Sequence, residues 1–103
     1  MPEYKVIALD RLQEGRGRVA LAGTTRVAVF LIEGVYYATR NFCPHAGGSL
    51  GTGRVRGLIV TCPRHDWGFN VKTGACVTQK MYSIATFPTR AADGFLWVDV
   101  PDS

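Results

Sequence analysis

The sequence predicts an all-β fold, built as an antiparallel sandwich or barrel. Three observations predict this class. Short runs of β-branched, aromatic and other apolar residues follow one another along the chain, turns that contain glycine separate them, and no segment sustains a helical period. About eight short strands joined in this way are typical of an antiparallel sandwich or barrel.

The first half of the chain is expected to form strands that tight turns connect. Glu33-Gly34 has the composition of a two-residue hairpin turn. The expected segments are a strand at residues 4–9, a loop at 12–17 with room for a short helix at 9–13, strands at 19–21 and 26–32 around a turn at 23–25, and a strand at 35–38.

The second half is expected to continue the same pattern with shorter strands. Pro88 is expected to end one of them, because proline lacks the backbone N–H that a strand ladder needs. The expected segments are strands at 55–61 and 69–71, a turn at 72–74, a strand at 83–87, a turn at 92–94 and an alternating strand at 95–100.

Length and composition are those of one globular domain. The chain has 103 residues, of which 47% are hydrophobic and 19% charged, so we expect a single domain over residues 1–103. The longest strongly apolar run, residues 27–32, is too short to span a bilayer. The first residues do not have the pattern of a secretory signal. We therefore expect a cytoplasmic protein without a membrane anchor.

The charge pattern argues against nucleic-acid binding. The formal net charge is +4, yet the arginines are dispersed along the sequence and form no basic stripe. Two interpretations remain open, a solvated surface with a mild positive excess and a surface that steers an acidic redox partner. The dispersed arginines include Arg16, Arg18, Arg26, Arg40, Arg54, Arg56 and Arg64.

Two short motifs carry the chemistry of this chain. Cys43-Pro44-His45 offers one thiolate and one imidazole, and Cys62-Pro63-Arg64-His65 offers the same pair again. Four such ligands can close a tetrahedral zinc site or hold an iron–sulfur cluster. Glycines at 47, 48, 51, 53 and 57 suit loops that wrap a compact inorganic centre. Hairpins should bring both loops to one end of the sheets.

With their flanking residues, the two motifs resemble the cluster loops of Rieske-type 2Fe–2S proteins. The resemblance covers fourteen positions, residues 43–48 and 62–69, and extends more loosely through Thr73-Gly74 and Phe87-Pro88. It implies an all-β domain with a small cluster-binding subdomain at one end. It also implies that Cys43 and Cys62 bind one iron of the cluster, and that His45 and His65 bind the other.

The rest of the sequence predicts a carrier rather than an enzyme. Both histidines belong to the cluster motifs, which leaves none for a mononuclear iron site of the two-histidine, one-carboxylate type. Membrane-anchored Rieske subunits carry an extra cysteine in each loop, but Gly48 and Arg64 stand at those positions. The chain is therefore more similar to stand-alone Rieske ferredoxins, and we expect no catalytic residues.

The predicted function is one-electron transfer from a flavin-dependent reductase to the terminal component of an oxygenase, by a monomer that docks transiently. One alternative is the small Rieske subunit of an assimilatory NADH-dependent nitrite reductase. A second alternative is a zinc-binding interaction module. Cys76 is expected to be a half-buried structural thiol. Residues 75–87 lack the proline that the family often has in the loop that covers the cluster, so a looser or different cover is expected.

Overall fold

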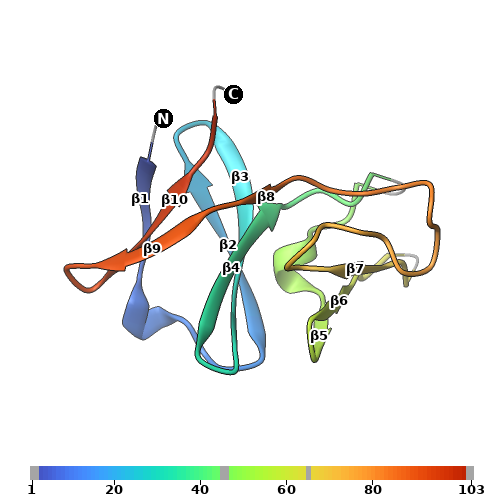
Figure 1. The fold of residues 1–103 in the computed structure, drawn as a ribbon, viewed down its shortest axis with the longest axis horizontal. Helices are drawn as coiled ribbons and strands as arrows, with labels where there is room; N and C mark the ends of the chain where they lie inside the picture. The colour runs from blue at the N-terminus through green and yellow to red at the C-terminus, as the bar shows by residue number, and fades with distance from the viewer. Residues whose placement is uncertain (1–2, 45–46, 65, 102–103) are drawn as a thin grey trace.

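A computed structural model describes residues 3–44, 47–64 and 66–101 of the chain, and these residues form three antiparallel sheets (Figure 1). Two sheets, with strand orders β1-β10-β9 and β2-β3-β4-β8, build a sandwich that we call the base. The third sheet, with order β5-β6-β7, belongs to a smaller part beside it, the loop subdomain. The predicted all-β class is therefore confirmed.

The elements follow closely on one another, and most connections are short. The base contains β1 (Glu3–Ala8), η1 (Leu9–Arg11), β2 (Arg16–Ala22), β3 (Thr25–Ile32), β4 (Val35–Arg40), β8 (Thr86–Phe87), β9 (Thr89–Ala92) and β10 (Phe95–Asp99). The loop subdomain contains η2 (Leu50–Thr52), β5 (Arg54–Arg56), β6 (Ile59–Thr61) and β7 (Gly68–Asn70).

Strand β3 joins the base to the loop subdomain because both of its faces are buried. Val27 and Val29 point into the core of the base, where they meet Leu96 and other residues of the first sheet. Ala28 and Phe30 point the other way, into the core of the loop subdomain. A strand buried on both faces needs a continuous apolar run, which explains the run at residues 27–32.

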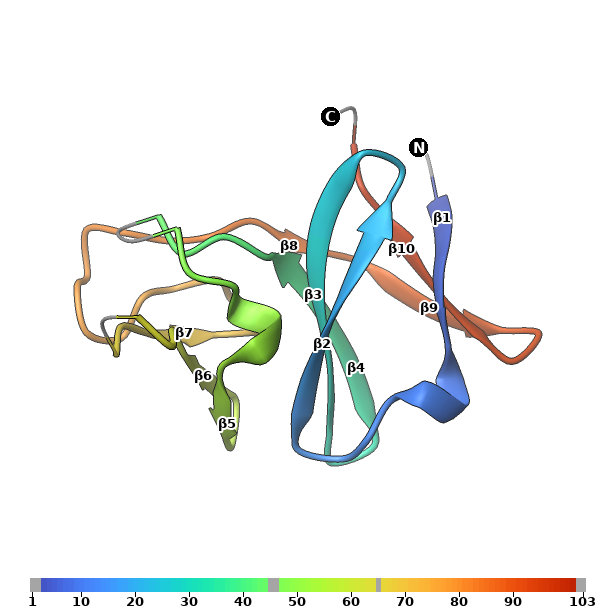
Figure 2. The ribbon, with the colours of Figure 1, turned by 180° about the vertical axis from the view of Figure 1, so that it is seen from behind.

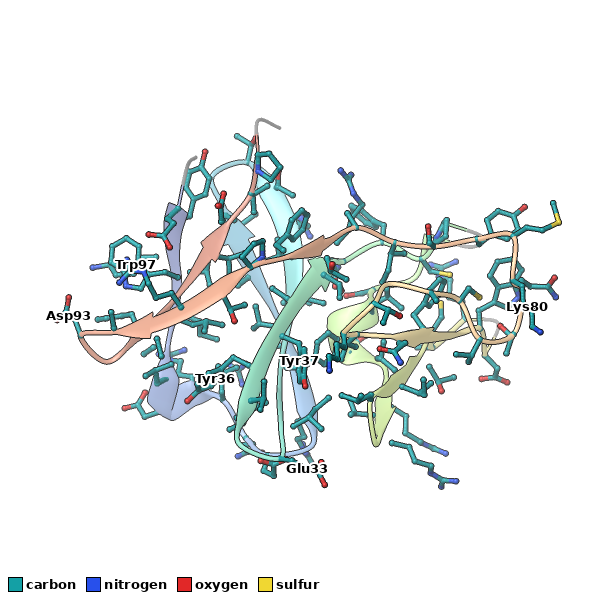
Figure 3. The ribbon with its side chains drawn as sticks, viewed as in Figure 1. Glu33, Tyr36, Tyr37, Lys80, Asp93 and Trp97 are labelled. Atoms are coloured by element: carbon teal, nitrogen blue, oxygen red, sulfur yellow. The ribbon has the colours of Figure 1, made fainter. Side chains whose placement is uncertain are left out.

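Successive side chains of strand β4 also point in turn to the core of the base and to the core of the loop subdomain. Tyr36 packs against the core of the base and Tyr37 against the core of the loop subdomain. Figure 3 shows the two rings on opposite sides of the strand. The two cores are therefore separated by a single layer of backbone. A change in the packing of one core should alter the packing of the other.

The tight turns have the backbone that their sequences predict. Glu33 and Gly34 have φ angles of 51° and 77°, as a type I′ hairpin turn requires, and Asp93 and Gly94 repeat this with 55° and 79°. The turn expected at residues 23–25 is shorter by one residue, because Ala22 already pairs with Thr25.

Two expected strands were wrong. Residues 55–61 form not one strand but the hairpin β5–β6, because Gly57 adopts a φ of 59° and reverses the chain. Residues 83–87 contain only the two-residue strand β8, and the chain resumes as β9 directly after Pro88. The short helix considered at residues 9–13 is the 3-10 turn η1.

Paired glycines let the loop subdomain pack closely on the base. A Cβ at Gly51 of η2 would lie 2.9 Å from the carbonyl carbon of Arg18 in β2, and a Cβ at Gly17 would lie 2.9 Å from the Gly51 oxygen. These separations are below what real Cβ atoms tolerate. Because both positions are glycine, η2 can pack directly against β2 (Figure 2). This packing also holds the loop that contains Cys43, which directly precedes η2, close to β2.

None of the described helices is long and apolar enough to cross a membrane.

Candidate metal centre

The two loops that carry the cysteine–histidine motifs have the same backbone hydrogen bonds. In the first, the Cys43 N–H donates to the Gly48 carbonyl at 2.9 Å and the Gly47 N–H donates to the Cys43 carbonyl at 2.8 Å. In the second, the Cys62 N–H donates to the Trp67 carbonyl at 2.8 Å and the Asp66 N–H donates to the Cys62 carbonyl at 3.1 Å. Each cysteine therefore begins an equivalent turn.

The fifth residue of each turn lies in the left-handed region. Gly47 has a φ of 67° and Asp66 a φ of 60°. Glycine reaches this region without strain, and aspartate tolerates it better than most other side chains do. An aspartate directly after His65 in the sequence therefore suits the backbone of this turn.

Both cysteines are buried in one apolar core. Cys43 is 1% exposed and Cys62 0% exposed, and both belong to the core of the loop subdomain. A Cβ at Gly48 of the first loop would lie 2.6 Å from the Sγ of Cys62 in the second. The two loops are therefore in direct contact, and glycine at position 48 leaves room for the Cys62 sulfur.

The contact between the two loops involves Gly48 and Arg64, the positions at which membrane-anchored Rieske subunits carry their extra cysteines. The Cβ that Gly48 lacks would lie 3.6 Å from the Cβ of Arg64. This separation is within the range that a disulfide spans. The fold thus brings Gly48 and Arg64 to the geometry of a loop-bridging disulfide, which this chain cannot form because neither residue is a cysteine.

A buried amide holds the first loop in place. Asn41 is 2% exposed, and its Oδ1 accepts a 2.8 Å hydrogen bond from the Gly51 N–H. Its Nδ2 donates to the Ser49 Oγ at 3.0 Å, and its carbonyl accepts from the Leu50 N–H at 2.7 Å. No motif in the sequence singles out Asn41. Its place between a predicted strand and a ligand loop was the only available signal.

The segment that follows β7, residues 75–82, covers the second loop, and we call it the cover. Val77 donates its N–H to the Gly68 carbonyl at 2.8 Å, and Cys76 forms a bridge with Phe69. The rings of Trp67 and Tyr82 pack with centroids 5.0 Å apart. The cover therefore closes through backbone bonds and an aromatic contact, without the proline that the family often has there.

Cys76 belongs to this cover and is more buried than the half-buried thiol we expected. It is 3% exposed. Its Sγ lies 3.3 Å from the Thr78 Oγ1 and accepts the Gln79 N–H at 3.3 Å. These contacts fit a structural thiol.

The two predicted histidine ligands lie outside the described residues. His45 and His65 therefore remain predictions from the motifs. Within residues 3–44, 47–64 and 66–101, no group of three or more histidine, cysteine, aspartate or glutamate side chains is arranged to hold a metal ion. The structure brings together the two loops and their cysteines, which is the half of the ligand set that it describes.

Comparison with known proteins decides the family. Residues 4–99 match the family of Rieske-like 2Fe–2S domains. The chain belongs to the Rieske family. Its cofactor is accordingly a Rieske 2Fe–2S cluster, and the two buried thiols on adjoining loops fit the sulfur ligands that such a cluster uses. The zinc-binding alternative is not supported.

The curated relatives include both kinds of protein that the sequence resembles. The chain is 30% identical over 100 residues to the ferredoxin component of the naphthalene 1,2-dioxygenase system of Pseudomonas putida, covering 93% of each chain. It is 38% identical over 71 residues to the ferredoxin CarAc of Metapseudomonas resinovorans, covering 68% of this chain and 66% of the relative. It is 31% identical over 110 residues to a nitrite reductase of Emericella nidulans, covering 93% of this chain but only 10% of that protein.

Solved structures show the same two groups. A ferredoxin in complex with the oxygenase of carbazole 1,9a-dioxygenase is 29% identical with a TM-score of 0.84, and the match covers 94% of this chain and 92% of that one. A Mycobacterium tuberculosis protein assigned as an NADH-dependent nitrite reductase small subunit is 26% identical with a TM-score of 0.87, and the match covers 97% and 96%. This Rieske protein is therefore an electron carrier rather than a catalytic component, related to oxygenase ferredoxins and to nitrite reductase small subunits.

Proposed function

We propose that this Rieske protein accepts one electron from a flavin-dependent reductase and delivers it to the terminal component of an oxygenase. The observation that carries the proposal is the pair of equivalent, adjoining loops with buried cysteines. A cluster bound there takes up and releases one electron at a time. The chain's own contribution is to hold the loops together and to exclude water from the sulfur side.

The proposed ligands are Cys43 and Cys62 on one iron, and His45 and His65 on the other. The buried cysteines define the inner side of the site, at the core of the loop subdomain. In this assignment the imidazoles lie on the outer side, where their ring nitrogens offer a short route to a partner.

The proposed docking face surrounds the loops. Phe42, directly before the first cysteine, is 48% exposed, and Met81 in the cover is 92% exposed. Tyr82 is also exposed and packs on Trp67, which ties the cover to the second loop. Exposed apolar and aromatic side chains next to a redox centre suit a small, transient interface. We infer a monomer formed by one domain, working in the cytoplasm.

Support for an oxygenase as acceptor comes from the ferredoxin–oxygenase complex of carbazole 1,9a-dioxygenase, whose ferredoxin is similar to this chain. The second candidate, a permanent small subunit of a nitrite reductase, draws equal structural support from the M. tuberculosis protein. The two functions differ in the permanence of the partner rather than in the chemistry of the site.

Size-exclusion chromatography of the native protein from its own cells tests the choice. A ferredoxin should elute near the mass of one chain, 11.2 kDa, and its dithionite-reduced form should be reoxidised when it is mixed with an oxygenase component. Co-elution with a nitrite reductase at a much larger mass would favour the second candidate. Failure of every oxygenase component to reoxidise the protein would contradict the proposed acceptor.

A further inference from the structure

The structure gathers arginines that are dispersed in the sequence. Five of them line one open groove with a volume of about 1400 Å³, which we call the arginine groove: Arg11, Arg16, Arg18, Arg54 and Arg56. Among the described residues that line it, Asp66 is the single acidic one. The lining therefore carries four excess positive charges, as many as the formal net charge of the whole chain.

Strand geometry explains why these arginines meet. Arg16 and Arg18 alternate with Gly17 along β2, and Arg54 and Arg56 alternate with Val55 along β5, so each pair points to one side of its strand. Strand β5 lies beside β2, at the end of β2 where Arg16 and Arg18 stand (Figure 2). Arg11 joins them from η1.

Apart from Asp66, the described residues that line this groove provide no counter-charge. All five side chains are exposed. The ion pair found among the described residues, between Arg90 and Glu3, lies elsewhere, and none of the five arginines takes part in one. Guanidinium groups left without carboxylate partners keep their donors for an external anion, which they can bind in bidentate fashion.

We propose that the arginine groove is the docking site for an acidic segment of this protein's redox partner. This inference rests on the proposed electron-carrier function, since only a redox partner needs to reach the cluster. Cys62, Pro63 and Asp66 of the second loop form one part of the groove lining. A partner held by the arginines is therefore placed against the loop that contains His65.

The shape and composition of the groove favour a protein segment over other anions. Pockets for small ligands have volumes of roughly 300–1000 Å³ and enclose most of the ligand, whereas this groove is larger and open. Single-stranded nucleic acids are held by aromatic side chains on which bases stack, and none of the described residues that line the groove is aromatic. Aspartate and glutamate side chains on a partner provide the carboxylates that arginine recognises.

The test uses a short fluorescein-labelled polyglutamate peptide as the probe, with fluorescence anisotropy at low ionic strength. The groove variant replaces Arg18, Arg54 and Arg56 by glutamine. The control variant replaces Arg26, Arg40 and Lys72, which are exposed but do not line the groove, by glutamine. Both variants lose three positive charges, one from the groove and the other from surfaces outside it.

We expect the groove variant to bind the peptide about tenfold more weakly than the wild type, and the control variant to bind within about twofold of it. Equal weakening by both variants, or no binding at all, would overturn the proposal. An oligonucleotide of equal length that binds more tightly than the peptide, and depends on the same arginines, would overturn the choice of a protein partner.

The visible spectrum of each variant, before and after dithionite, separates this inference from the proposed function. A wild-type protein without a reducible cluster would contradict the electron-carrier function. An intact, reducible cluster in all three proteins, with peptide binding that does not depend on the groove, would contradict only the assignment of the docking site.

Discussion

At the scale of single residues, Gly48 of one ligand loop leaves room for the sulfur of the other. A methyl group there would lie 2.6 Å from the Cys62 Sγ, so Gly48→Ala should displace the sulfur and lower the cluster content of the purified protein. The ratio of visible absorbance to protein measures this content.

Gly57→Ala is the control, because Gly57 has a positive φ but nothing within 4 Å of an added Cβ. It should cost about 1 kcal/mol of stability and leave the cluster content unchanged. Full cluster content in Gly48→Ala would contradict the close approach.

Asn41 is the buried side chain that fixes the first loop. Asn41→Ala leaves the Gly51 N–H without its acceptor in a buried position, which should cost about 1–3 kcal/mol in the free energy of unfolding. Urea denaturation measures this loss. Asn70→Ala is a matched control, since Asn70 also accepts backbone N–H groups, from Lys72 and Thr73, but in an exposed turn. We expect a smaller loss there, and equal losses in the two variants would contradict the bracing role of Asn41.

Phe69 lacks a hydroxyl group that would raise the reduction potential of the cluster. High-potential Rieske proteins place a tyrosine hydroxyl at this position and a serine hydroxyl at the position of Trp67, and hydrogen bonds of this kind stabilise the reduced cluster. Phe69 is 0% exposed and shares its core with Cys43 and Cys62. We therefore expect a wild-type potential at the low end of the Rieske range, on the order of −150 mV, and a higher potential in Phe69→Tyr.

Protein-film electrochemistry at neutral pH measures both values. Phe30→Tyr is the control, because Phe30 is equally buried in the same core but stands on β3 rather than in the stretch that follows the second ligand loop. A wild-type potential above roughly +100 mV would conflict with the absence of these hydroxyls.

At the scale of elements, one bidentate ion pair links strand β1 to strand β9 of the same sheet. Arg90 of β9 donates to both carboxylate oxygens of Glu3 in β1, at 2.9 and 3.1 Å, across the intervening β10. The hydrogen bond from Arg90 lowers the pKa of Glu3 below its ordinary value. A lowered folded-state pKa contributes stability above the unfolded-state pKa, and that contribution is lost as the pH falls through the folded-state value.

The stability difference between the wild type and Glu3→Gln should therefore be small but present at neutral pH, and should vanish in acid. Urea denaturation at a series of pH values measures it. In the Arg90→Gln background, Glu3→Gln should have no pH-dependent effect. A difference that persists in acid would show that the Glu3 side chain acts through packing rather than through its charge.

The sequence predicts some elements of this fold better than others. Turns whose residues need a positive φ, such as Glu33-Gly34 and Asp93-Gly94, lie where expected because few other residues adopt that backbone. The hairpin at Gly57 was missed because Val55 before the glycine and the apolar run at residues 58–60 after it resemble one continuous strand. Strand β9 was missed because Pro88 was taken as an end. Asp99 donates its N–H to the Pro88 carbonyl, so the chain passes the proline without leaving the sheet.

At the scale of the whole molecule, the base and the loop subdomain are two cores that share β3. The ligand motifs predicted that the two loops lie together, because cysteine and histidine at fixed spacing have few other uses. The brace at Asn41 and the arginine groove could not be predicted, because both depend on packing between segments distant in sequence. Figure 3 shows the two parts in space, with Asp93 at the end of the base and Lys80 at the opposite end of the molecule, in the cover.

The central claim is that Cys43, Cys62, His45 and His65 hold a Rieske cluster that carries one electron. Electron paramagnetic resonance of the dithionite-reduced protein, recorded for the wild type and for serine variants of the three cysteines, tests it most directly. We predict a signal from one unpaired electron per chain in the wild type and in Cys76→Ser, and no such signal in Cys43→Ser or Cys62→Ser. A silent wild-type protein that contains zinc, or a signal lost in Cys76→Ser and kept in Cys43→Ser, would contradict the account.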